Sequence, residues 1–194
     1  MILITGCGRS GTKYISKVVQ TLGLDLVHEG LGADGSVSWH QGLKTSSYPK
    51  KYAQLRPDFD LILHQVRNPL DVIISFTTAT EDTWEWVRSK VRINTKLSKL
   101  GQAAEYWYYW NRLIEKSANW TYRIENLENE WKTFTSFLGL SAPYSKIKAI
   151  STKTNSREHS KITWRDIDEA TRLSSKIRWL ASHYGYKKAE KYVS

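Results

Sequence analysis

The stretch Ile2–Lys13, which reads ILITGCGRSGTK, decides the fold. It begins as a short apolar run, continues through three glycines and turns directly into a pattern of helical spacing. Glycines allow positive φ and a close approach to a ligand, so successive N–H groups can converge on one anion. The start of a helix adds unpaired N–H donors and the positive end of its dipole. The stretch therefore predicts a strand, a phosphate-binding loop and a helix.

The spacing of this loop matches a P-loop only in part. Gly6 and Gly11 have the G-x-x-x-x-G spacing, but Thr12 and Lys13 follow in the reverse of the usual Lys-Ser/Thr order. That order matters because a nucleotidase places the Lys on the β/γ-phosphates and the next hydroxyl on Mg²⁺. Arg9 offers a cation from inside the loop instead. A glycine-rich turn without a ligand is the alternative interpretation of the loop alone.

Composition narrows the class of protein. A chain of 194 residues favours one domain, here 1–194, and a net charge of +10 implies an anionic partner such as a nucleotide, a nucleic acid, an acidic membrane or a polyanionic substrate. The single cysteine, Cys7, excludes an internal disulfide and a multi-cysteine zinc site. The apolar start is too short for a signal peptide, and no run is long enough to span a membrane. We expect a soluble cytoplasmic protein.

Along the chain, segments with helical spacing alternate with short apolar strands. We expect strands at 24–27, 59–66 and 120–124, and helices at 11–22, 69–76, 83–100, 103–114, 131–138 and 167–184. A short helix is expected to begin at 37–40, and Gly101 is expected to end the helix 83–100. The polar stretch 151–161 is expected to be a mobile loop. This alternation predicts an α/β fold of three layers, α/β/α, around a central parallel sheet. The glycine loop would lie at the C-terminal edge of the sheet.

Five large aromatic residues follow one another in the predicted helix 103–114, at positions 106–110. We expect them to pack in the core, because large aromatic side chains dominate protein cores. Stacking on an adenine base is the alternative.

Two segments together resemble the family of sulfotransferases that use 3′-phosphoadenosine 5′-phosphosulfate (PAPS). Gly6–Lys13 resembles the 5′-phosphosulfate loop of the family, and Val66–Ser75 (VRNPLDVIIS) resembles its 3′-phosphate element, an Arg after a strand with a Ser eight residues on. Tyr122–Leu127 is similar to the Y-E-D-L-type strand end of the family. The R-S-G-T sequence and the His28-Glu29 pair look closer to tyrosylprotein and bacterial sulfotransferases than to cytosolic small-molecule enzymes.

The resemblance implies a P-loop-like sulfotransferase fold, PAPS as co-substrate, 3′-phosphoadenosine 5′-phosphate (PAP) as product and no required metal. PAPS carries two separate anionic ends, so it needs two anion sites. The family has a late basic loop near the 3′-phosphate, so the resemblance implies a further contact with the nucleotide from Arg157. The R-K-G triplet that cytosolic members have in this loop is missing here. The nucleotide-binding residues implied are Gly8, Arg9, Ser10, Gly11, Thr12, Lys13, Arg67, Ser75 and Arg157.

The chemistry that the resemblance implies is transfer of a sulfuryl group to a hydroxyl or amine. Such a transfer resembles phosphoryl transfer, so positive charge from Arg9 and Lys13 would stabilise the transition state. Glu29 is the general base by analogy with the family, and His28 competes with it because imidazole titrates nearer neutrality. Since neighbours on a strand point to opposite faces, we expect only one of these two to reach the site.

Three other functions stay open at this stage. A P-loop kinase or other nucleotide-binding protein would need the usual Lys-Ser/Thr order and an acidic residue after the strand 59–66. A thiol phosphatase would use Cys7 and want an Arg at position 13, where Lys13 stands. A non-enzymatic module that binds nucleic acid would use the basic surface.

No sequence motif identifies the acceptor, and a sugar, a lipid, a peptide or a small molecule are all compatible with the sequence. Its pocket would come from residues 30–58, the helix 81–100 and the late loop. The oligomeric state is not encoded in any motif.

Overall fold

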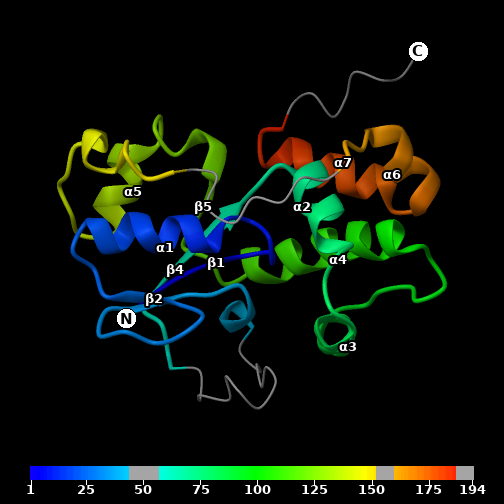
Figure 1. The fold of residues 1–194 in the computed structure, drawn as a ribbon, viewed down its shortest axis with the longest axis horizontal. Helices are drawn as coiled ribbons and strands as arrows, with labels where there is room; N and C mark the ends of the chain where they lie inside the picture. Colours follow the sequence, from blue (N-terminus) through cyan, green and yellow to red (C-terminus); the bar gives the residue numbers. More distant parts are fainter. Residues whose placement is uncertain (44–56, 152–159, 187–194) are drawn as a thin grey trace.

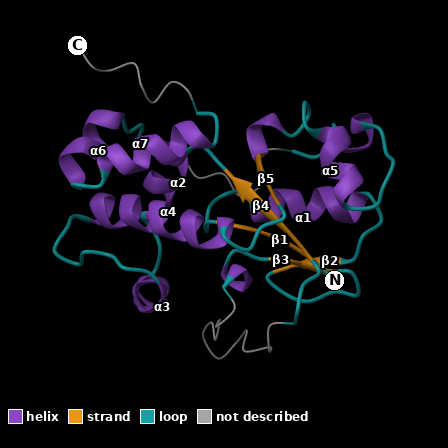
Figure 2. Cartoon of the chain, turned by 180° about the vertical axis from the view of Figure 1, so that it is seen from behind, coloured by secondary structure: helices purple, strands orange, loops and turns teal. Residues whose placement is uncertain are grey.

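The computed structural model describes residues 1–43, 57–151 and 160–186. Its centre is a parallel sheet of five strands in the order β2-β3-β1-β4-β5 (Figure 2). The strands are β1 (Ile2–Gly6), β2 (Leu26–His28), β3 (Gly35–Val37), β4 (Leu61–Val66) and β5 (Trp120–Arg123). The predicted parallel sheet is thus confirmed.

Helices cover both faces of this sheet (Figure 1). The helices are α1 (Thr12–Thr21), α2 (Pro69–Phe76), α3 (Glu81–Lys90), α4 (Lys99–Glu115), α5 (Trp131–Phe137), α6 (Trp164–Ala170) and α7 (Ser174–His183). On one face, α1 and α5 pack on the sheet around Ile4 and Leu63, and on the other α4 lies against β1 and β4, with α2, α3, α6 and α7 around it. The three-layer α/β/α arrangement is confirmed.

The strands β1 and β4 end side by side, which places the loops that follow them at one edge. Gly6, the last residue of β1, pairs with Gln65, the last but one of β4. The chain after β1 reaches the first turn of α1 in five residues, and α2 begins three residues after β4. Ligands of open α/β sheets bind at this carboxyl edge, so the predicted loop and the Arg67 turn are correctly placed to share one site.

The segment after Gly35 differs from the prediction. A short helix was expected to begin at 37–40, but Gly35–Val37 is the strand β3, inserted between β1 and β2, and only His40–Gly42 forms one 3-10 turn. A three-residue strand is too short to show an alternating pattern. Its pairing with two neighbours stabilises it instead.

The prediction of one helix over 83–100 that ends at Gly101 is also wrong. The helix α3 ends at Lys90, and α4 begins at Lys99 and runs through Gly101. Ser98 caps α4, because its hydroxyl accepts a hydrogen bond from the N–H of Gly101 at 3.2 Å. A Cβ at position 101 would lie 2.3 Å from the carbonyl oxygen of Ala170, so this glycine allows α4 and α6 to touch.

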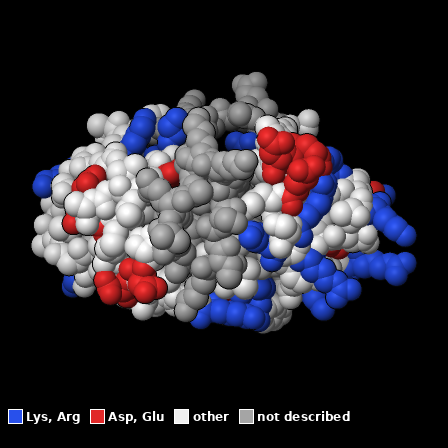
Figure 3. Space-filling view, turned by 90° about the horizontal axis from the view of Figure 1, so that it is seen from below, with Lys and Arg blue, Asp and Glu red and all other residues white. Residues whose placement is uncertain are grey.

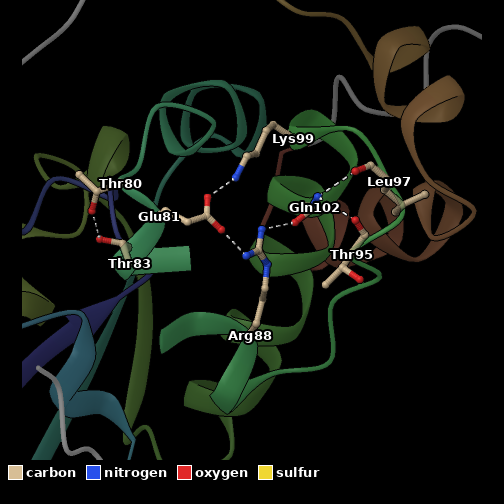
Figure 4. Close-up of polar contacts among 8 residues, drawn as sticks. All are labelled: Thr80, Glu81, Thr83, Arg88, Thr95, Leu97, Lys99 and Gln102. Carbon is tan, nitrogen blue, oxygen red and sulfur yellow. Dashed lines mark hydrogen bonds and ion pairs between the residues drawn. The ribbon is translucent and has the colours of Figure 1, made fainter. Parts of the chain in front are cut away.

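Side chains around Glu81 connect the start of α3 with the start of α4 (Figure 4). Its carboxylate accepts hydrogen bonds from Arg88 at 2.5 Å and Lys99 at 2.8 Å. Arg88 also donates to Gln102 on α4, at 2.8 Å. The basic residues predicted for a single amphipathic helix therefore lie on two helices and the loop between them.

The predicted last helix, 167–184, is two helices. α6 ends at Ala170 and α7 begins at Ser174, with Thr171 in an extended conformation between them. Thr171 donates its hydroxyl to the buried carboxylate of Glu105, at 3.0 Å. This long-range hydrogen bond fixes the break, and apolar periodicity does not show it.

Within the three described ranges, no helix combines the length and the apolar character needed to cross a membrane.

Candidate active site

A cavity of about 950 Å³ opens at the carboxyl edge of the sheet, a size common for ligand pockets. Its wall is formed by the loop after β1, the residues after β2, the Arg67 turn and the helix α2, with residues 160–162 beside them. Most of the residues predicted for the site lie on this wall: Gly8, Arg9, Gly11, Thr12, Lys13, His28, Glu29, Arg67 and Ser75. Residues from three separate strand ends are thus brought to one cavity.

The first turn of α1 presents backbone N–H groups at this cavity. Gly11 takes the left-handed conformation, with φ of 94°, and the hydrogen-bonded turn begins only where Tyr14 donates to the carbonyl of Gly11. No described side chain caps the helix. The N–H groups at Thr12 and Lys13, the positive end of the helix dipole and the ammonium of Lys13 therefore place positive charge beside the cavity, an arrangement that favours an anion.

The loop between β1 and α1 is held from behind by buried groups. The N–H of Gly8 donates to the hydroxyl of Tyr106 at 2.8 Å, and the side-chain amide of Gln65 donates to the carbonyl of Ser10 at 2.7 Å. Tyr106 stacks on Phe76 of α2, with ring centroids 3.9 Å apart, and thereby links the loop to α2. The aromatic cluster at 106–110 supplies this core contact, as predicted.

Two expectations for this loop are wrong. Gly6 and Gly8 do not take positive φ; they are needed for space, because a Cβ would lie 2.1 Å from the Gln65 carbonyl oxygen at position 6 and 3.1 Å from the Phe76 ring at position 8. The N–H of Gly8 also faces Tyr106 rather than a ligand. The glycines that open the loop therefore serve packing, and Gly11 alone of the three has the left-handed backbone.

Two non-glycine residues with positive φ occur in the described chain, and both line the cavity. Arg9 has φ of 75° and Glu29 has φ of 54°. This region costs side-chain-bearing residues free energy, about 1 kcal/mol or more, and such residues cluster at functional sites. Both had been predicted to take part in the chemistry.

Arg67 lies where β4 turns into α2, and its guanidinium spans the loop and the helix. It donates to the carbonyl oxygen of Arg9 at 3.2 Å and lies 3.7 Å from the carboxylate of Asp71. Asn68 caps α2 by accepting a hydrogen bond from the N–H of Leu70. Ser75 lies on the same wall near the end of α2, so this helix and the turn before it bring a second set of hydrogen-bond donors to the cavity.

His28 and Glu29 both reach the cavity, which corrects the expectation that only one would. His28 ends β2, and Glu29 follows the strand in a left-handed conformation, so the alternation of strand faces does not apply to it. The Nε2 atom of His28 lies 3.2 Å from the hydroxyl oxygen of Thr12. Burial lowers the pKa of His28, Glu29 raises it and Lys13 lowers it further, so the imidazole is neutral at pH 7.

One predicted residue, Ser10, lies apart from this wall. The hydroxyl of Ser10 is buried beneath the loop, outside the lining of the cavity, and has no hydrogen-bond partner among the described residues. Arg157 lies outside the described residues. The lining also includes side chains that sequence patterns did not single out, among them Trp39, Asp71 and Lys161. Of these three, only Lys161 had a feature in the sequence that could have pointed to the site, because it is a basic residue in the predicted late loop.

Cys7 is buried in the core under the loop. Its sulfur lies 3.8 Å from the carbonyl oxygen of Trp107, and burial raises the pKa of the thiol well above its usual value. A nucleophilic cysteine needs the opposite, a lowered pKa and access to substrate. The environment of Cys7 is that of a packing residue.

Basic and acidic side chains share the face seen in Figure 3. Blue side chains lie along its lower edge and toward the right-hand end, where Figure 1 draws α3 and the loop into α4, and a compact acidic group lies beside them. Among the charges of α3 and α4, the carboxylate of Glu81 pairs with Arg88 and Lys99. Among the described residues drawn on this face, basic side chains thus lie in separate groups with acidic groups beside some of them.

Comparison with known proteins gives likenesses to solved structures. No protein-family model matches the chain, and no curated protein matches it. A solved structure with similarity is that of a mouse sulfotransferase complexed with PAP, which is 14% identical, with a TM-score of 0.49 over 99% of this chain and 88% of the other. The function of the cavity therefore has to be argued from its own residues.

Proposed function

We propose that the chain is a sulfotransferase that moves a sulfuryl group from PAPS to a hydroxyl or amine acceptor and releases PAP. The observation that carries the proposal is the single cavity into which two separate anion-binding groups project, Arg9 and Lys13 with the start of α1, and Arg67 with Ser75 on α2. A nucleotide with a phosphosulfate at one end and a phosphate at the other matches two such groups. The strained conformations of Arg9 and Glu29 support a functional role for this wall.

The residues of the cavity fit this donor. The uncapped first turn of α1 offers N–H donors at Thr12 and Lys13 to the phosphosulfate, and Arg67 and Ser75 are assigned to the 3′-phosphate. Arg9, Lys13, Arg67 and Lys161 supply four cations, against the two carboxylates of Glu29 and Asp71. The excess of positive charge suits a polyanionic nucleotide.

The proposed reaction is a direct transfer. The S–O bond to the bridging phosphate oxygen breaks, a new S–O bond forms to a hydroxyl acceptor or a new S–N bond to an amine, and the acceptor proton leaves to a base. Arg9 and Lys13 stabilise charge on the sulfuryl oxygens and on the leaving phosphate. No metal-bound water or covalent intermediate on the enzyme is required.

Glu29 is the proposed general base, with His28 as the alternative. Both line the cavity next to Lys13, and a neutral His28 could accept a proton as well. The contact with Thr12 engages the Nε2 atom of His28 in a hydrogen bond, which favours Glu29 as the group left to receive the proton.

The rival functions fit the structure less well. A Mg²⁺-dependent kinase needs an acidic residue at the end of β4 to hold the metal, and the residues there are Gln65, Val66 and Arg67. A thiol phosphatase wants an accessible thiolate, and Cys7 is buried. A nucleic-acid-binding surface needs a continuous basic stripe, whereas basic and acidic side chains of the described residues share the face in Figure 3.

Labelled PAPS incubated with sugar, lipid, peptide and small phenol or amine acceptors tests the proposal. We expect release of PAP and labelling of one acceptor class. Glu29→Gln should lower turnover by about 100-fold or more with little change in PAP affinity, because it removes a base and keeps the shape. Glu128→Gln, an exposed change outside the cavity, is the matched control. No PAP release with any class, or full turnover in Glu29→Gln, would contradict the respective assignments.

A further inference from the structure

The carboxylate of Glu125 joins two segments that are distant in the sequence. Glu125 lies in the 3-10 turn Ile124–Asn126 directly after β5, and one of its oxygens, Oε1, accepts a hydrogen bond from the backbone N–H of Asn68 at 2.7 Å. The other oxygen, Oε2, accepts from the hydroxyl of Tyr186 at 2.8 Å. Asn68 immediately follows Arg67, so the carboxylate acts on the backbone of the turn that aims this arginine.

The end of α7 places Tyr186 at this carboxylate. Gly185 has φ of 84°, its N–H donates to the carbonyl of Ser182, and the N–H of Tyr186 donates to the carbonyl of Ala181. This pair of hydrogen bonds is the Schellman ending of a helix, which reverses the chain in a fixed geometry. Tyr186 is therefore held in place by the helix end itself.

Arg123 supports the same segment from β5. Its guanidinium donates to the carbonyl of Gly185 at 2.9 Å and lies 5.5 Å from the centre of the Tyr186 ring. A Cβ at position 185 would lie 3.4 Å from this guanidinium, an ordinary van der Waals contact, so the left-handed backbone rather than a lack of space favours glycine there. Tyr186 thus has contacts that do not depend on Glu125.

The electrostatics keep the Tyr186 hydroxyl a donor. Burial and the nearby charge of Glu125 raise the pKa of Tyr186 far above its ordinary value, whereas Arg123 and Arg67 lower it to a smaller extent. The phenol stays protonated throughout the physiological range of pH.

Neither Glu125 nor Tyr186 lines the cavity, so any effect on a ligand passes through the Arg67 turn. Resting on the function proposed above, we propose that Glu125 and Tyr186 are positioning residues that fix this turn so that Arg67 receives the 3′-phosphate of the nucleotide. The end of α7 thereby determines selectivity for a nucleotide with a 3′-phosphate.

Calorimetry on the full chain with PAP and with adenosine 5′-phosphate, which lacks the 3′-phosphate, tests this role. Tyr186→Phe should weaken PAP binding about 3- to 10-fold, the worth of about one hydrogen bond, and change adenosine 5′-phosphate binding less than about twofold. Glu125→Gln should weaken PAP binding at least as much. Tyr144→Phe and Glu128→Gln, which lie away from the cavity, are the matched controls.

A double-mutant cycle with Arg67→Ala separates positioning from general stability. We expect Tyr186→Phe to have no further effect on PAP once Arg67 is absent. Equal weakening of both nucleotides, an unchanged PAP affinity, or full additivity with Arg67→Ala would overturn the positioning role alone. A wild-type protein that binds PAP no more tightly than adenosine 5′-phosphate would instead contradict the proposed function, and the positioning role with it.

Discussion

Arg67 is the residue on which the assignment of the second anion site depends most. Its guanidinium is about one third exposed and lies between the carbonyl of Arg9 and the carboxylate of Asp71. Both contacts are modest, since the pair with Asp71 is 3.7 Å apart and solvent-exposed. An incoming phosphate can therefore compete for this guanidinium and form shorter, charge-assisted hydrogen bonds.

Arg67→Ala is expected to weaken PAP binding about 10- to 100-fold, because hydrogen bonds to charged groups are worth about 1.5–3 kcal/mol. Glu29→Gln should leave this affinity nearly unchanged, since its role lies in turnover. Arg165→Ala, an exposed arginine of α6 outside the cavity, is the control for loss of charge. Isothermal calorimetry measures all three, and similar losses for Arg67→Ala and Glu29→Gln would contradict the division of roles.

Buried histidines give the fold a pH dependence. His64 is fully buried in β4, hydrogen-bonded to Asn111 and Thr121, and burial lowers its pKa to about 4. Between about pH 6.5 and 4 the unfolded chain binds a proton there that the folded chain does not, so stability falls as pH falls. One such group accounts for about 3 kcal/mol across this window.

His64→Gln should reduce the loss of stability between pH 7 and pH 5, although it costs stability at pH 7 by disturbing a buried site. His40, whose pKa is also lowered to about 4 by burial, remains and keeps part of the dependence. Urea unfolding at both pH values measures the difference. The same slope in wild type and variant would refute this explanation.

At the residue level, the site was predictable where it follows a local pattern. Arg9, Lys13, Glu29, Arg67 and Ser75 belong to short segments with recognisable spacing, and all line the cavity. The contacts that hold the loops of the site in place were not predictable in this way. Tyr106 contacts Gly8 from 98 residues away, and Tyr186 reaches the Arg67 turn from the end of α7, so only the fold brings them together.

At the level of elements, those with a strong local signal were predicted correctly, and those that are short or interrupted were not. The β1 strand, the glycine loop and α1 are confirmed, as are β4 and α2, because buried apolar runs and a Pro at a helix start are strong local signals. The three-residue β3 and the breaks at 91–98 and 171–173 were missed. Strand pairing and the Thr171–Glu105 hydrogen bond decide the first and the last of these, and both depend on partners distant in the chain. The Ser98 cap decides the start of α4, and it is a local contact with Gly101 that the apolar pattern does not reveal.

Gly101 shows how packing can reverse a local preference. Replacing a helical glycine with alanine normally stabilises by up to about 1 kcal/mol. Here Gly101→Ala should destabilise by about 1–3 kcal/mol, because the new Cβ would collide with the Ala170 carbonyl oxygen. The midpoint of urea unfolding measures this. Thr133→Ala, at an exposed position of α5, is the control and should be neutral or slightly stabilising. A more stable Gly101→Ala protein would contradict the close α4–α6 contact.

At the scale of the whole molecule, the parallel sheet explains why segments far apart in sequence form one site. The ends of β1, β2 and β4 bring Lys13, Glu29 and Arg67 to the same edge, and the helices behind them fix the loops. The net charge of +10 adds a long-range attraction for anions that weakens with salt. Charge alone does not select a ligand, however, so the proposal rests on the set of cationic and hydroxyl side chains that share one cavity.

The most direct test of the sulfotransferase assignment is calorimetry with PAP in the absence of metal against ATP with Mg²⁺. We predict that PAP binds without a metal and at least about tenfold more tightly than ATP with Mg²⁺, a difference of about 1.4 kcal/mol. Both titrations are made at physiological ionic strength, so that non-specific attraction to the basic surface is screened. Tight binding of ATP with Mg²⁺ and no binding of PAP would contradict the account.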